Sequence, residues 1–170
     1  ITSTGFGTAD FEQWSFSSQS LLFALMFMGG CAGSTAGGMK IARVYLLFKF
    51  FLAEIVRLVH PNAIVPVRMN GEAVPRGVVE NVLGYFVLYM LSLGVGTILL
   101  SFMGVDLVTA ITAGVSSLSN IGPGLGTIGP SENYAHLPIA AKWLLSLLML
   151  MGRLEIFTVV ILFSPTYWKK

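Results

Sequence analysis

The stretch DLVTAITAGVSSLSNIGPG, Asp106 to Gly124, joins a short apolar segment to a glycine-rich loop. Asp106 stands at a position typical of a helix N-cap, so a helix is expected over residues 106–118. This helix has little more than half of the ~20 residues that cross a bilayer. A short apolar helix followed by the loop at 119–124 predicts a half-helix that enters the membrane and a chain that returns to the same side.

The composition indicates the bilayer as the solvent of this chain. Hydrophobic residues make up 55% of the 170 residues, charged residues 11%, and mean hydropathy is +0.80. A soluble domain has about a quarter charged residues, so these charges could not cover a water-facing surface. The basic residues are scattered among apolar stretches, which argues against nucleic-acid binding. A single cysteine, Cys31, excludes an internal disulfide and is expected to pack as a small residue.

Two long apolar segments flank the half-helix and its loop. Residues 77–103 carry only Glu80 as a charge and predict a transmembrane helix. Residues 125–137 are a polar outer loop, and residues 137–164 predict a second full span that contains Arg153 and Glu155. Pro165 is expected to end this span. The order is therefore helix, half-helix, glycine loop, helix.

The N-terminal part of the chain contains an interrupted membrane segment. Residues 1–19 are polar and predict a loop, while residues 20–59 form one element broken at 29–38 by GGCAGSTAGG, five glycines in ten residues. Irregular backbone at membrane depth is tolerated where protein buries it or where it lines an aqueous cavity. Residues 60–76 contain three prolines and predict a linker. Six of the ten Lys and Arg residues lie within 40–76, so the linker and the C-terminus are expected in the cytoplasm.

An internal repeat links the two parts of the chain. The sequence STGFGT at 3–8 resembles SNIGPGLGT at 119–127, and each is followed by a polar loop and an apolar helix that is broken or charged near its middle. The chain thus holds one whole unit and the second half of the unit before it, as a fragment of a longer protein would. Glycine allows neighbouring backbone carbonyl groups to point in one direction, where their oxygens can replace the water around an ion. The C-terminal end of a half-helix adds a partial negative charge that faces the same ion. Gly5 and Gly122 fit this role.

Four segments carry a resemblance to a known family. They are TSTGF at 2–6, GGCAGSTAGGMK at 29–40, SNIGPG at 119–124 and GRLE at 152–155. In that order they resemble the third filter, the third-repeat loop, the fourth filter and the charged centre of the last helix in the Trk/Ktr/HKT superfamily of potassium transporters. The Trk-type (TrkH-like) uptake subunits are the most similar members. The resemblance covers essentially the whole chain, and the glycine-rich run is its most specific part.

The resemblance implies an all-α integral membrane protein with potassium-channel-like M1–P–M2 repeats and re-entrant pore loops. This chain would be one complete repeat and half of the preceding one. Residues 1–59 would be the third-repeat filter loop, outer loop and interrupted M2 helix, 60–76 the cytoplasmic linker, and 77–170 the fourth repeat. The fourth repeat would comprise M1 at 77–103, the pore helix at 106–118, the filter at 119–124 and M2 at 137–164. The resemblance further implies a multi-pass protein of the cell inner membrane, in contact with lipid, that forms a homodimer and binds a cytosolic nucleotide-binding regulatory subunit.

The same resemblance assigns the transported ion and the residues around it. Potassium would pass the filter residues Thr4, Gly5, Phe6, Asn120, Ile121, Gly122 and Pro123, and would be held by the backbone carbonyls of Ser3, Thr4, Gly5, Asn120, Ile121 and Gly122. An intramembrane gate would comprise Gly29, Gly30, Gly33, Ser34, Thr35, Gly37, Gly38 and Arg153.

The residues at 29–38 and in the last helix fit such a gate on their own chemistry. Five glycines are expected to make the segment mobile, and Ser34 and Thr35 offer polar groups to a wet cavity. Arg153 lies about 15 residues into its helix, a depth below the filter where a charge needs a partner or an aqueous cavity. Glu155 is two positions further on, so it is expected to face elsewhere and to be a poor partner for Arg153.

Two other functions stay open on the sequence. A secondary transporter for another monovalent cation could bind it at broken helices, and a non-transporting scaffold could share the short helices. Half-helices that end in glycine loops argue against the scaffold. An enzyme is not expected, because the sequence has no nucleophile arrangement or His/Cys/Asp cluster, and His60 and His136 fall in loops. With two of four filter strands outside the chain, the fragment alone is not expected to conduct, and selectivity for potassium over sodium is left open.

Overall fold

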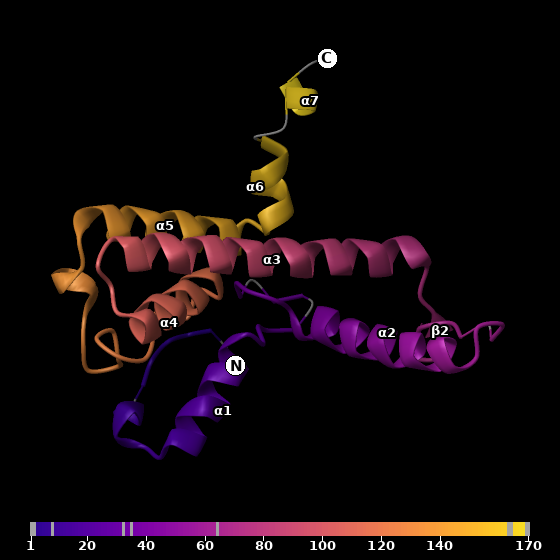
Figure 1. The fold of residues 1–170 in the computed structure, drawn as a ribbon, viewed down its shortest axis with the longest axis horizontal. Coiled ribbons are helices and arrows are strands. Elements are labelled where there is room, and N and C mark those ends of the chain that lie inside the picture. The colour runs from indigo at the N-terminus through magenta and orange to yellow at the C-terminus, as the bar shows by residue number, and fades with distance from the viewer. Residues whose placement is uncertain are drawn as a thin grey trace.

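A computed structural model describes residues 3–7, 9–31, 33–34, 36–63, 65–162 and 165–168 of the chain. It is built mainly of helices, which confirms the predicted fold class. Helix α3 (Arg76–Phe102) and helix α5 (Ile139–Arg153) run side by side, and the short helix α4 (Leu107–Leu118) packs against both (Figure 1). Helix α2 (Ile41–Val59) lies along the other end of α3, and helix α1 (Phe16–Met26) lies below α4 in this view.

Helix α3 is the long apolar element of the structure. Among the described residues it is the one unbroken helix long and apolar enough to cross a membrane. It ends at Phe102, and Gly104, just after the C-cap residue Met103, has a φ of +85° that suits a residue without a side chain. Helix α4 then begins at once, because the Asp106 carboxylate accepts a hydrogen bond from the Val108 N–H at 3.1 Å. The half-helix predicted from the sequence is therefore present as a separate element.

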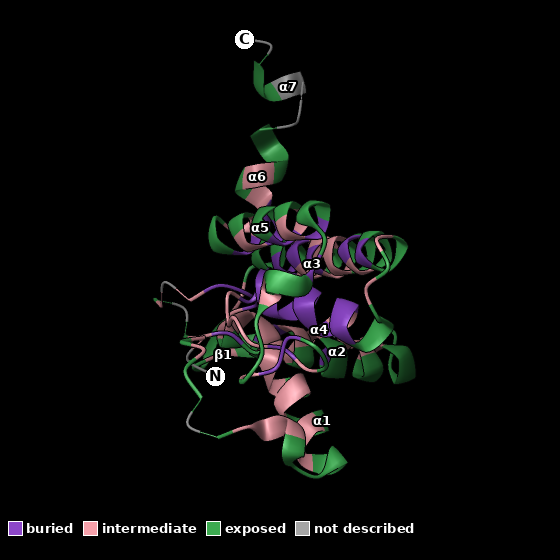
Figure 2. Cartoon of the chain, turned by 90° about the vertical axis from the view of Figure 1, so that its left-hand side faces the viewer, coloured by how far each residue is buried: buried purple, intermediate pink, exposed green. Residues whose placement is uncertain are grey.

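Helix α4 is the most enclosed element of the chain, as Figure 2 shows. Its small side chains allow this position between α3 and α5. Gly114 approaches Leu93 of α3, where an added Cβ would lie 3.0 Å from the leucine side chain. On the other side, a Cβ on Gly152 of α5 would collide with the Leu118 carbonyl oxygen. Close backbone approach thus replaces side-chain interdigitation at the end of α4 that faces the glycine loop.

The last apolar segment differs from its prediction. The sequence predicts one spanning helix over residues 137–164, but α5 ends at Arg153 and helix α6 (Ile156–Leu162) follows at an angle of 110°. Glu155 sits at the break with φ +60°, a left-handed conformation that ends a helix. Figure 1 shows α6 leaving the bundle, with helix α7 (Pro165–Trp168) beyond it.

The linker between α2 and α3 folds as a small hairpin. Strands β1 (Arg68–Met69) and β2 (Glu72–Ala73) pair antiparallel, with Arg68 opposite Ala73 and Met69 opposite Glu72. Asn70 and Gly71 both have positive φ, as a two-residue hairpin turn requires. The hairpin is held to α2, because Lys49 donates to the Arg68 carbonyl oxygen at 3.0 Å.

Candidate functional site: two glycine loops and the loop beneath them

The two repeated loops share an unusual backbone. In the first loop Ser3 has φ +54° and Gly5 has φ +78°, and in the second Asn120 has φ +53° and Gly122 has φ +110°. Left-handed conformations are rare outside glycine, so the same pattern at the same spacing is not a chance feature of two turns. The repeat proposed from the sequence is therefore present in the dihedral angles, with Ser3 equivalent to Asn120 and Gly5 to Gly122.

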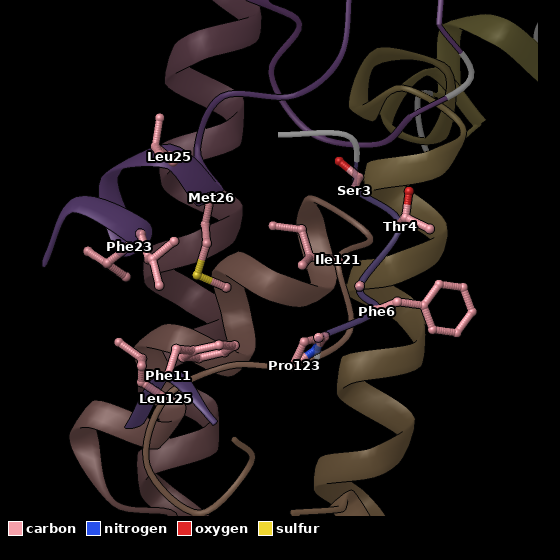
Figure 3. A pocket seen from close by; sticks show the side chains of 13 residues that line it. Ser3, Thr4, Phe6, Phe11, Phe23, Leu25, Met26, Ile121, Pro123 and Leu125 are labelled. Carbon is pink, nitrogen blue, oxygen red and sulfur yellow. The ribbon is translucent and has the colours of Figure 1, made fainter. Parts of the chain in front are cut away.

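The two loops also meet in space. A Cβ on Gly5 would collide with the Ile121 carbonyl oxygen and would lie 3.3 Å from Pro123 Cδ. Both loops line a cavity of about 320 Å³ that is closed on one side by α1 (Figure 3). Phe6 points away from this cavity, and its side chain is 95% exposed. The structure thus brings the predicted filter residues of both repeats together.

Helix α4 directs its C-terminal end at the second loop. The Ile121 N–H donates to the Ser116 carbonyl oxygen at 2.9 Å, which continues the last turn of α4 into the loop. The remaining carbonyl groups of that turn carry the partial negative charge of the helix end. A cation beside residues 120–122 would therefore face a favourable field.

Side chains that the sequence analysis missed hold the second loop in place. The Ser116 hydroxyl accepts from the Gly122 N–H at 3.0 Å and donates to the Pro123 carbonyl oxygen at 2.9 Å. The Tyr134 hydroxyl donates to the Gly122 carbonyl oxygen. Asn120 donates from Nδ2 to the Met149 carbonyl oxygen of α5 at 3.1 Å. The sequence signal that could have indicated Ser116 is its place on a short apolar helix, because a buried hydroxyl group needs a hydrogen-bond partner.

The glycine-rich segment 29–38 forms a closed loop between α1 and α2. The Gly29 N–H donates to the Met39 carbonyl oxygen at 2.9 Å, and the Ile41 N–H donates to the Gly30 carbonyl oxygen at 3.2 Å. At the tip of the loop, the Ser34 hydroxyl accepts from the Ala36 N–H at 3.2 Å. Thr35, which the resemblance assigns to the gate, lies outside the described residues.

The base of this loop packs against the second filter loop. A Cβ on Gly37 would lie 2.5 Å from Asn120 Nδ2, and one on Gly38, which has φ +75°, would lie 2.9 Å from Ser119 Oγ. Both glycines are buried, whereas Gly33 is exposed and has open space around it. Close packing is therefore a second role of the glycines at the base of this segment, beside the mobility that the sequence predicts.

Charged residues join the last helix to the same loop. Glu155 forms ion pairs with Lys40 at 3.4 Å and with Arg43 at 3.1 Å, both just after the loop. The Arg43 guanidinium also lies 4.1 Å from the ring centre of Tyr85, whose hydroxyl donates to the Gly38 carbonyl oxygen at 3.3 Å. Sequence reasoning missed this cluster because Glu155 is more than 110 residues from Lys40 and Arg43 in the chain.

Arg153 is the last residue of α5, and it is exposed. It follows Gly152, which lies against the last carbonyl group of α4, and it directly precedes the break at Leu154 and Glu155. The base of the loop at 29–38 thus contacts the second glycine loop, and the ion-pair cluster directly follows that base in the chain. Within the described ranges no three His, Cys, Asp or Glu side chains are close enough to hold a metal ion, and a site made of backbone carbonyl groups needs none.

A family model described as TrkH, cation transport protein, matches residues 1–170. The chain belongs to the TrkH family. Trk system potassium uptake protein TrkH from Halomonas elongata is 44% identical over 169 residues, covering 99% of the chain and 35% of that relative. The TrkH protein of Escherichia coli K12 is 41% identical over the same shares. The family description is one of transport and not of catalysis, in agreement with the expectation that the chain is not an enzyme.

A solved TrkH structure has the same fold. The crystal structure of the potassium transporter TrkH from Vibrio parahaemolyticus matches with a TM-score of 0.90 and 42% identity, covering 99% of this chain and 36% of that one. The chain therefore spans about a third of the length of the TrkH relatives it matches.

Proposed function

We propose that this chain supplies two of the four walls of a potassium path in a longer TrkH-family transporter. The observation that carries the proposal is the meeting of two loops with the same left-handed pattern, where Gly5 lies against the Ile121 carbonyl oxygen. A pseudo-symmetric ion path requires loops with the same backbone conformation arranged around one axis. Relatives that are 41% and 44% identical to this chain are named as potassium uptake proteins, which supports the choice of ion.

Potassium would be bound as transported substrate by backbone oxygens. The carbonyl groups concerned are those of Ser3, Thr4 and Gly5 in one loop and of Asn120, Ile121 and Gly122 in the other. They would replace part of the water around the ion, and the C-terminal end of α4 would add to the negative potential. The loops of the remaining repeats would complete the ring of ligands.

The loop at 29–38, with Arg153, would act as the gate beneath this filter. Its support is positional, since Gly37 and Gly38 pack under Asn120 and Ser119. A positive charge about 8 Å from a cation repels it by ~2 kcal/mol at an effective dielectric of about 20, enough to slow passage more than tenfold. Opening would require the loop base to leave the filter, and the charged cluster around Glu155 would move with it.

The membrane orientation and the partners follow from the charge distribution and the family. The TrkH family places the chain in a membrane. We expect a multi-pass inner-membrane protein with linker 60–76 and the C-terminus in the cytoplasm, because basic residues concentrate near the linker. A cytosolic nucleotide-binding regulatory subunit would then meet the linker hairpin and the inner end of α2. A homodimer of the longer protein is proposed on the family resemblance.

A pair of glycine substitutions tests the proposed filter in the full-length transporter. Gly122→Ser is expected to lower the selectivity for potassium over sodium, because φ +110° is strained for a side chain and the carbonyl groups must shift. Gly104→Ser is the matched control, since Gly104 has φ +85° and equally open surroundings but follows the end of α3, away from the filter. Selectivity is measured as rubidium and sodium uptake into proteoliposomes. Equal selectivity in both variants and the wild type would show that residues 119–124 are an ordinary outer turn.

A further inference from the structure

The Gly122 peptide groups are held from both sides by side chains. The N–H donates to the Ser116 hydroxyl at 3.0 Å, and the carbonyl oxygen accepts from the Tyr134 hydroxyl. Glycine at φ +110° has little intrinsic barrier to rotating its peptide planes. Hydrogen bonds to both groups remove that freedom, so the direction of this carbonyl group depends on Ser116 and Tyr134.

The element that follows the first loop is of the same kind but begins with a residue that lacks a hydroxyl group. Each filter loop is followed by a short 3-10 helix, η1 (Phe11–Gln13) or η2 (Tyr134–His136). Each is capped alike, since the Asp10 carboxylate accepts from the Glu12 N–H and the Asn133 amide oxygen accepts from the Ala135 N–H. The first residue is Phe11 in η1 and Tyr134 in η2.

Phe11 and Tyr134 thus begin the corresponding 3-10 helices after the two loops. Phe11 lines the cavity next to the first loop, facing Leu125 (Figure 3). A phenylalanine cannot donate a hydrogen bond, so the Gly5 carbonyl group cannot receive from Phe11 the bond that Gly122 receives from Tyr134. The second loop therefore receives from the first residue of its 3-10 helix a hydrogen bond that Phe11 cannot give.

We propose that Tyr134 is a positioning residue for ion discrimination, holding the Gly122 carbonyl group of the fourth filter strand through its hydroxyl group. The inference rests on the proposed function and assigns selectivity to a side chain that does not itself face the ion. Burial raises the pKa of the Tyr134 phenol above its ordinary value, while the neighbouring Ser116 opposes this shift in part. The hydroxyl group therefore keeps the proton that it donates.

The test compares tyrosine-to-phenylalanine variants of the full-length transporter. Tyr134→Phe removes the hydroxyl group and makes the second loop like the first. Tyr45→Phe is the control, since Tyr45 is an exposed tyrosine on α2, away from the filter. Ser116→Ala is a second variant that releases the N–H side of the same glycine. Each protein is reconstituted, and uptake of potassium, rubidium and sodium is measured together with the melting temperature.

Tyr134→Phe is expected to reduce potassium-over-sodium discrimination about two- to tenfold, the factor that corresponds to one net hydrogen bond. Ser116→Ala is expected to reduce it in the same direction, and Tyr45→Phe to leave it unchanged. Intact discrimination in both filter variants, with a lowered melting temperature, would overturn the inference and leave Tyr134 as a support of the outer loop. A wild-type protein that moves no potassium would instead overturn the proposed function, and this inference with it.

Discussion

Replacing Glu155 by glutamine tests whether the ion pairs at the break between α5 and α6 keep the loop at 29–38 closed below the proposed filter. The carboxylate pairs with Lys40 at 3.4 Å and Arg43 at 3.1 Å, and the Glu155→Gln variant would lose both ion pairs while keeping the side-chain shape. The Glu155 side chain is 42% exposed, so solvent screens these pairs and the full Coulomb energy does not apply. Each pair then contributes about 0.2–1 kcal/mol, and the two together about 0.5–2 kcal/mol.

That energy sets the size of the expected effect. If the pairs exist only while the loop is closed, their loss raises the open fraction about two- to thirtyfold. The substitution also removes a negative charge beside Lys40 and Arg43, which by itself makes the local potential more positive and lowers cation flux. An increase in flux can therefore come only from the gate opening more often, and not from a more favourable potential.

The assay is rubidium uptake into vesicles that contain the full-length transporter without its regulatory partner. Glu155→Asp should keep most of the basal closure, because the charge remains. Glu54→Gln is the matched control, since Glu54 pairs with Arg57 at 2.5 Å within α2, outside the cluster. Unchanged flux in Glu155→Gln with a lower melting temperature would show that the cluster only joins helices. A similar rise in Glu54→Gln would show general loosening of the protein.

Three further outcomes are expected. Gly37→Ala should lower the stability by about 1–3 kcal/mol through overpacking against the filter, whereas Gly33→Ala, in open space, should change the melting temperature little. In a cysteine-free background, cysteine at Asn70 should react with an impermeant thiol reagent only from the cytoplasm, and cysteine at Asn133 only from outside; labelling of both from one side contradicts the re-entrant topology. Burial raises the pKa of the Tyr134 phenol above its ordinary value of 10.0, so the stability that the neutral phenol contributes is complete below that pH and is lost as the pH rises through the raised pKa. The potassium-over-sodium selectivity should therefore be constant from about pH 6 to about pH 9.

The elements that local sequence determines were predicted closely. The expected helix at 77–103 corresponds to α3 at Arg76–Phe102, because an uninterrupted apolar run and a following glycine specify it. The half-helix was found through Asp106, whose capping role depends on a neighbour two residues away. The two glycine loops could be predicted because they repeat, and a repeat is visible without knowledge of the fold.

The features that depend on distant residues were missed. The segment 137–164 carries a glycine and two charges near its middle, but these do not by themselves mark a helix end. Helix α5 stops at Arg153, and local sequence could not show that Glu155 just after it pairs with Lys40 and Arg43. The support of Gly122 by Tyr134 could not be read either, since a tyrosine in a polar loop gives no sign of its partner. The hairpin in the linker could not be predicted either, because the strands that flank Asn70 and Gly71 have only two residues each and show no alternation.

The shared left-handed pattern of the two loops has a consequence for how such a protein can diverge. At the first position of the pattern one repeat has Ser3 and the other Asn120, with φ values of +54° and +53°. At this position the two repeats share a torsion angle and not a residue, whereas at the second position both have a glycine, Gly5 and Gly122. The sequences of two such repeats can diverge until they no longer align, while the backbone conformation of the two loops is retained. A repeat of this kind is then recognised better by comparing backbone φ angles along the chain than by comparing amino-acid types.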